Sequence, residues 1–167
     1  MSEDTENSRT PRGAAREIII FFLRFLAASF ALYLVYVVAG KFYTRLIALI
    51  ASPFLSAFGY ELVMDKANAI TEEISLNPVV FLSLVIAVGA IPWRTKLKAA
   101  VIGAAILTAL NSLTVFLAFV SFYRNSERLW TGSEFLSLTI NFFVPILLWL
   151  VLLPIRSAFP FLRDNNA

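Results

Sequence analysis

Residues 18–40 read IIIFFLRFLAASFALYLVYVVAG, and this stretch decides what kind of fold the chain can form. Its first 21 residues would extend about 31 Å as an α-helix, enough to cross the hydrocarbon core of a bilayer. Arg24 is the one charge within it. We expect the Arg24 side chain to reach back to the headgroups beside Arg16. The alternative is an intramembrane charge that serves a site or a partner.

The residues on either side of this stretch indicate an uncleaved anchor. Ala39 and Gly40 would suit the cleavage site of a signal peptide, which is the competing interpretation. However, the apolar core exceeds the usual ~7–15 residues, and the preceding segment is acidic. Residues 1–16 are polar and small, so we expect a disordered cytoplasmic tail.

Three more apolar stretches follow, at residues 76–92, 99–122 and 135–154. The whole chain of 167 residues is 59% hydrophobic, against ~45–50% in soluble domains. Its mean hydropathy is +0.79. We therefore predict an all-α fold, a polytopic membrane bundle of about four transmembrane helices. One membrane domain would cover residues 17–156, followed by a cytoplasmic tail at 157–167.

Two segments between the first and second spans differ from the rest. Residues 42–59 mix apolar residues at spacings of three and four with Arg45, Ser52 and Ser56, which predicts an amphipathic helix at the membrane surface. Pro53 would kink or end it, and a re-entrant or full span is the alternative. Residues 60–75 form an outer polar segment, in which partial alternation allows a short hairpin.

The distribution of Lys and Arg predicts the orientation in the membrane. With four spans and an inner amino terminus, inner segments would hold nine basic residues and outer segments five, together with six of the eleven acids. We expect a multi-pass protein of the bacterial cytoplasmic (inner) membrane with both termini in the cytoplasm. The lipid bilayer is its first partner.

Missing residue types restrict the chemistry. The chain has no Cys and no His, which removes the usual thiol and imidazole groups for nucleophilic, general-base or soft-metal chemistry. No glycine-rich phosphate loop and no run of basic residues occurs, so we expect no cofactor and no nucleic acid partner. The acidic residues Glu61, Asp65, Glu72 and Glu73 could bind a hard cation, but a solvated outer face explains them better. We predict no metal site.

A few polar and small residues inside the spans are candidates for helix packing. Asn111 is the most informative, because an amide in hydrocarbon needs a partner, and an interhelical hydrogen bond of this kind contributes about 0.6–2 kcal/mol. Small residues such as Gly103 let helix backbones approach closely. The predicted polar and packing positions are Asn111, Ser112, Thr114, Gly103 and Asn141, with Asn141 a candidate partner of Asn111.

The second outer loop is rich in charged and aromatic residues. Surface pairing or recognition of a partner is the function we expect there, rather than catalysis. The predicted partner-binding residues are Arg124, Glu127, Arg128, Trp130 and Glu134.

The order of features in the second half resembles the exosortase/archaeosortase family, particularly its short members. A short apolar helix ends in Ile91-Pro92-Trp93-Arg94, and a small-residue helix then contains Ala109-Leu110-Asn111-Ser112-Leu113-Thr114. A polar loop with Trp130 and an aromatic-rich span follow. The resemblance implies a membrane protein related to enzymes that cleave and transfer carboxy-terminal sorting signals.

Only part of the family motif carries over. The family places a catalytic Cys at the start of the helix before Pro92-Trp93, an Asn-x-x-Arg motif in the next helix, and a His near the last span. Asn111 matches the Asn, Thr114 stands at the Arg position, and residues 74–78 occupy the Cys region without a Cys. The resemblance therefore implies a degenerate member that lacks the catalytic Cys, Arg and His.

These observations leave three hypotheses open. The first is a non-catalytic accessory protein that binds an active exosortase or its substrate. The second is an active membrane transpeptidase or protease with an unconventional nucleophile, such as Ser75. The third is a small transporter or channel subunit unrelated to sorting.

Overall fold

Every regular element in the described part of the chain is helical. The computed structural model describes residues 11–67 and 76–154. The main elements are α2 (Pro11–Ala57), α4 (Asn77–Ala87), α5 (Trp93–Arg124) and α6 (Glu127–Leu152). Three of these, α2, α5 and α6, are long and apolar enough to cross a membrane, whereas α4 is a shorter apolar helix. The prediction of an all-α fold is confirmed for the described residues, and three helices could span a membrane; the predicted number of four spans is not confirmed.

Local sequence explains where the shorter helices begin and end. Helix α4 has proline in its first turn, where the missing N–H costs no hydrogen bond. Helix α5 ends at Asn125, which adopts a left-handed conformation (φ 46°) and donates its N–H to the carbonyl of Phe122. The next residue, Ser126, caps α6 by accepting the N–H of Leu129. These adjacent caps produce a tight hairpin between α5 and α6.

Helix α2 contains both the predicted first span and most of the predicted surface segment. It runs unbroken for 47 residues, about 70 Å, through the predicted span 18–40, the predicted surface segment 42–59 as far as Ala57, and Pro53. The spacing of three and four is real, but the buried face belongs to a helix–helix contact. Four side chains of this face pack in one cluster with Val115 and Phe119 of α5. They are Ile47, Ala48, Ala51 and Leu55.

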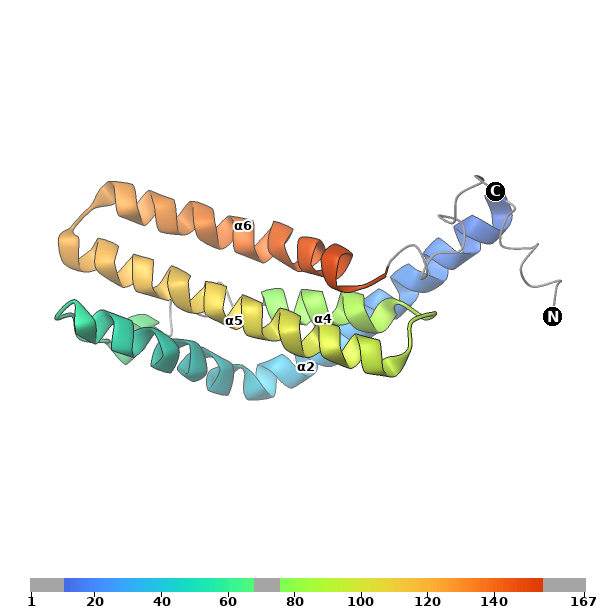
Figure 1. Cartoon of the computed structure of the whole chain (residues 1–167), viewed down its shortest axis with the longest axis horizontal. Helices are drawn as coiled ribbons and strands as arrows, with labels where there is room; N and C mark the ends of the chain where they lie inside the picture. The colour runs from blue at the N-terminus through green and yellow to red at the C-terminus, as the bar shows by residue number, and fades with distance from the viewer. Residues whose placement is uncertain (1–10, 68–75, 155–167) are drawn as a thin grey trace.

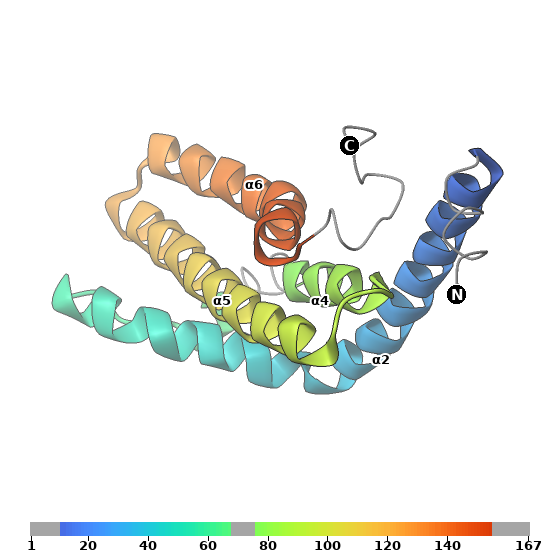
Figure 2. The ribbon, with the colours of Figure 1, turned by 45° about the vertical axis from the view of Figure 1, so that its right-hand side comes forward.

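Contacts along the molecule define the helix directions (Figure 1). At one end, the Arg24 side chain of α2 reaches Gly89, just before α5. At the other end, the ring of Tyr60, just after α2, stacks on Tyr123 of α5. Helices α2 and α5 therefore run in the same direction, and α4 and α6 run against them. The first half of α2 diverges from the other helices, as Figure 2 shows.

The return from α2 to α4 is only partly helical. Residues 60–63 are irregular and residues 64–67 form one helical turn, so no strand occurs in the described part of the predicted hairpin. The remainder of that segment, including Ser75, lies outside the described residues. Lys66 of the turn at 64–67 lies beside Phe122, at the Tyr123 end, and α4 runs toward the Arg24 end.

Two apolar clusters fill the interior. The first, built mainly from α4 and the first half of α5, contains Phe81, Val85, Val88, Ile91, Ala99, Leu107, Ile140 and Leu153. The second, built from the second halves of α2 and α5 and the turn at 64–67, contains Ile47, Ala48, Ala51, Leu55, Ala67, Val115 and Phe119. Polar side chains of α2, α4 and α5 lie between them.

Gly103 allows α4 to pack closely against α5. The ring of Phe81, which is fully buried, lies directly over Gly103, and a Cβ at that position would overlap the ring. The predicted role of Gly103 as a position of close helix packing is therefore seen here, with α4 as the partner.

Candidate functional site

Asn77 and Asn111 form a reciprocal amide pair in the interior. Asn77 Nδ2 donates to Asn111 Oδ1 at 2.8 Å, and Asn111 Nδ2 donates to Asn77 Oδ1 at 3.1 Å. Their side chains are 1% and 0% exposed. The pair fixes the start of α4 against the middle of α5, because a buried amide that loses its partner costs about 1–3 kcal/mol.

Helix α2 contributes the third group of this polar cluster. Asn111 Nδ2 also donates to the Tyr43 hydroxyl at 3.0 Å, and Thr108 Oγ1 lies 3.5 Å from the same oxygen. Next to the cluster, Ser112 Oγ donates to the Ile47 carbonyl at 3.3 Å. Three helices therefore meet through side-chain hydrogen bonds at one level of the bundle.

The chemistry of this cluster is that of a structural hydrogen-bond network. Both oxygen and nitrogen atoms of the Asn111 amide are bonded, and an amide is neither a nucleophile nor a general base. The hydroxyls of Thr108 and Ser112 also donate to backbone carbonyls of their own helix. Such hydroxyls lack the adjacent base that would activate them.

The other predicted packing residues lie elsewhere. Thr114 is buried, but its hydroxyl donates to the Leu110 carbonyl of the same helix at 3.1 Å. The predicted pairing of Asn141 with Asn111 is wrong, because Asn111 bonds to Asn77 and Tyr43. The Asn141 amide instead approaches Ser137 Oγ at 3.5 Å.

Three members of the cluster were not anticipated from the sequence. Asn77 precedes Pro78, and a proline in the first helical turn places Asn77 at a helix start, which is a readable signal. Tyr43 and Thr108 carry no such signal. A tyrosine two residues after Lys41 is typical of the membrane surface. Its place in the interior is evident only once α2 is known to continue beside α5.

At the end of the bundle where α5 turns into α6, aromatic and charged side chains connect the segment after α2 to the last turn of α5. The Tyr60 and Tyr123 rings are parallel within 6° and 4.7 Å apart, and the Tyr123 hydroxyl donates to the Glu61 carbonyl at 2.7 Å. Arg124 Nε donates to the Tyr60 hydroxyl at 3.3 Å. The ammonium group of Lys66 lies 3.4 Å from the centre of the Phe122 ring.

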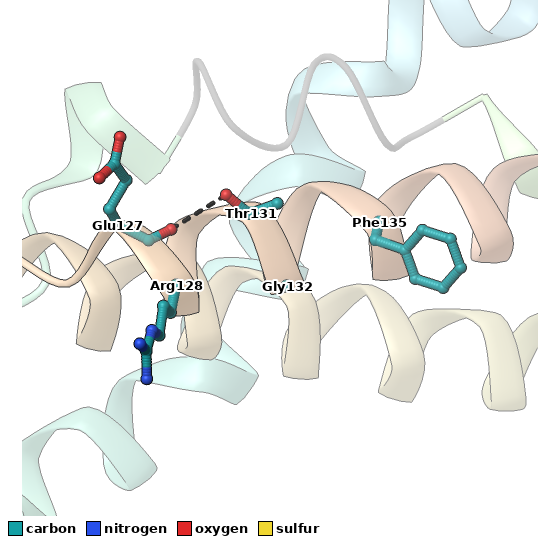
Figure 3. Close-up of a pocket in the computed structure, with 5 residues that line it drawn as sticks. All are labelled: Glu127, Arg128, Thr131, Gly132 and Phe135. Atoms are coloured by element: carbon teal, nitrogen blue, oxygen red, sulfur yellow. Dashed lines mark hydrogen bonds between the residues drawn. The ribbon is translucent and has the colours of Figure 1, made fainter.

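The predicted partner-binding residues are all exposed at this end. Glu127 and Arg128 line a shallow hollow with Thr131, Gly132 and Phe135, all from the first turns of α6 (Figure 3). Trp130 Nε1 donates to Glu134 Oε1 at 2.8 Å, which holds both side chains against the helix. Figure 3 shows the Glu127 and Arg128 side chains pointing to different sides of α6, so the hollow has no convergent polar groups.

Within the described residues, no three His, Cys, Asp or Glu side chains come together to hold a metal ion. Glu61 lies in the irregular segment after α2 and Asp65 in the helical turn at 64–67, whereas Glu72 and Glu73 lie outside the described residues. No protein-family model, curated protein or solved structure matches the chain.

Proposed function

We propose that this protein is a non-catalytic integral membrane protein of the bacterial cytoplasmic membrane, and that it assists an exosortase-type enzyme in sorting envelope proteins. The observation that carries the non-catalytic part is the closed amide pair of Asn77 and Asn111. A buried polar cluster with satisfied amides at its centre stabilises a bundle and offers no group that forms a covalent intermediate.

The same contact also supports the link to sorting enzymes. The resemblance matches Asn111 to the family Asn and places the family Cys in residues 74–78. In this chain Asn77 of that segment lies against Asn111. One residue of the region assigned to the Cys therefore lies next to the position matched to the family Asn, and that residue carries an amide, not a thiol.

The orientation follows from the charges at the two ends. Arg24, Arg94, Lys96 and Lys98 gather near the loop between α4 and α5, and the Arg24 contact with Gly89 joins α2 to that end. We propose that this end faces the cytoplasm, because positive residues concentrate on the inner side. The exposed end with Trp130 then faces outward, where a partner or its substrate tail would bind.

Co-purification tests the accessory function. The chain is co-expressed with a Cys-bearing sorting enzyme from the same cell and extracted in mild detergent. We expect the two proteins to elute together, and the charge reversal Arg128→Glu to reduce the recovered enzyme about fivefold, since close charge pairs contribute about 1 kcal/mol. Arg45→Glu, an exposed charge on α2, is the matched control and should leave recovery unchanged.

A separate assay tests whether the chain acts alone. The purified chain in liposomes is given a peptide with a carboxy-terminal sorting signal, and we expect no product above that from empty liposomes. Cleavage that disappears in Ser75→Ala would contradict the proposal and favour an enzyme with a serine nucleophile. A chain that is always recovered alone would contradict the accessory role.

A further inference from the structure

Four cationic side chains meet at the end of the bundle where α4 turns into α5. Arg24 comes from α2, and Arg94, Lys96 and Lys98 come from the first two turns of α5. Arg24, Arg94 and Lys98 are exposed, and Lys96 is half-buried. Residues far apart in the chain therefore lie at the same end of the bundle, which we call the basic end.

Gly89 holds the Arg24 side chain in this cluster. The guanidinium of Arg24 lies against the Gly89 backbone, and a Cβ at Gly89 would overlap Nη1. Because Gly89 is itself exposed, the guanidinium lies over accessible backbone and not in the apolar core. Arg24 is thus directed from a long apolar helix toward the loop at residues 88–92.

Lys96 approaches the same loop from the other side. Its Nζ donates to the carbonyl of Ile86, in the last turn of α4, at 3.4 Å. Since Arg24 lies against Gly89, three residues after Ile86, the two cations approach the same stretch of backbone. The fold therefore brings two like charges together instead of separating them.

No carboxylate in the described part of the chain neutralises this pair. Glu61, Asp65, Glu127 and Glu134 belong to the opposite end of the bundle. Glu17 lies on α2 seven residues before Arg24, about 10 Å away along the helix axis. Two like charges without a counter-charge repel each other, and an anion bound between them relieves that repulsion.

The surface beside the cations indicates which kind of anion. Trp93, Leu97 and Val101 follow one another at intervals of four on α5 and are 68%, 51% and 61% exposed. They form an apolar stripe next to Arg94 and Lys98 that suits acyl chains, with Trp93 at the headgroup level. We propose that Arg24 and Lys96 bind the phosphate of an anionic glycerophospholipid whose acyl chains lie along this stripe.

Native mass spectrometry of the full chain, released from detergent micelles and titrated with phosphatidylglycerol, tests this site. We expect Arg24→Gln to raise the Kd about fivefold, as loss of one headgroup cation predicts. Gly89→Ala keeps every charge but displaces the guanidinium, and it should also weaken binding. Arg45→Gln, which removes an exposed cation elsewhere on α2, should leave the Kd within about twofold of the wild type.

Several results would overturn the proposal. Equal Kd values for the wild type and Arg24→Gln would remove the role of Arg24, and an equal loss in Arg45→Gln would reduce the effect to net charge. Phosphatidylcholine bound as tightly as phosphatidylglycerol would exclude recognition of a net negative headgroup. Displacement of the lipid by millimolar inorganic phosphate would identify free phosphate as the ligand.

Discussion

At the scale of single residues, Asn111 contributes most to the specificity of the fold. Its amide bonds to Asn77 of α4 and to Tyr43 of α2, so one side chain fixes the position of α5 relative to two other helices. In a lipid environment apolar side chains pack in many registers with similar energy. The directional bonds of a buried amide therefore select one register.

We predict that Asn111→Ala lowers the free energy of unfolding by about 1–2 kcal/mol, because it leaves the Asn77 amide and the Tyr43 hydroxyl without their partner. The double variant Asn77→Leu/Asn111→Leu should recover part of that loss, since both members of the pair become apolar. Reversible unfolding in mixed detergent micelles measures both values. Thr139→Ala, which removes a hydroxyl bonded only to its own helix, should change the stability little.

How much of this cluster the sequence predicts depends on the residue. Asn111 is predictable because a lone amide in a long apolar run must find a partner. Its actual partners are not, because the spacing along the chain cannot tell which helices lie next to each other. The expected partner was Asn141, a residue of the same type in another helix. That pairing is wrong, because the Asn141 amide approaches Ser137 instead.

At the scale of helices, the packing of α4 on α5 depends on the absence of a side chain at Gly103. Phe81 fills the space that a Cβ would occupy. Gly132, in α6, offers the opposite case, since no neighbouring atom lies within 4 Å of a Cβ built there. Substitutions at Gly103 and Gly132 therefore separate the cost of crowding at a helix contact from the intrinsic helix preference of the new residue.

We predict that Gly103→Ala destabilises the protein by about 1–3 kcal/mol, because overpacking a close helix contact displaces the Phe81 ring. Gly132→Ala should instead be neutral or stabilise by up to about 1 kcal/mol, as alanine favours helix. Thermal unfolding in detergent measures both. Equal effects of the two substitutions would contradict the close contact at Gly103.

Helix α2 shows what a local pattern can and cannot reveal. The spacing that buries Ile47, Ala48 and Ala51 indicates an apolar face, and the structure has that face. An amphipathic pattern gives no information on what covers the apolar face. From the pattern alone, a position at the membrane surface was therefore expected. The second halves of α2 and α5 lie side by side, so the apolar face packs on protein (Figure 1).

At the scale of the whole molecule, we predict that residues 58–91 cross from one end of the bundle to the other. Among the described residues of this range, 58–67 and 76–91, α4 is the longest helix, with 11 residues. Three long helices and this return place Asp65 and Lys98 at opposite ends, although only 32 residues separate them in the sequence. Composition predicts helices that are long and apolar enough to cross a membrane, and the structure has them, but a short apolar helix such as α4 is weakly encoded in hydropathy.

Labelling of single cysteines tests this arrangement most directly, because the chain has no cysteine of its own. Asp65→Cys and Lys98→Cys are each introduced, and an impermeant maleimide is applied to spheroplasts before and after permeabilisation. We predict that Cys at position 65 reacts in intact spheroplasts and that Cys at position 98 reacts only after permeabilisation. Reaction of both positions in intact spheroplasts, or of neither, would show that residues 58–91 do not cross the membrane.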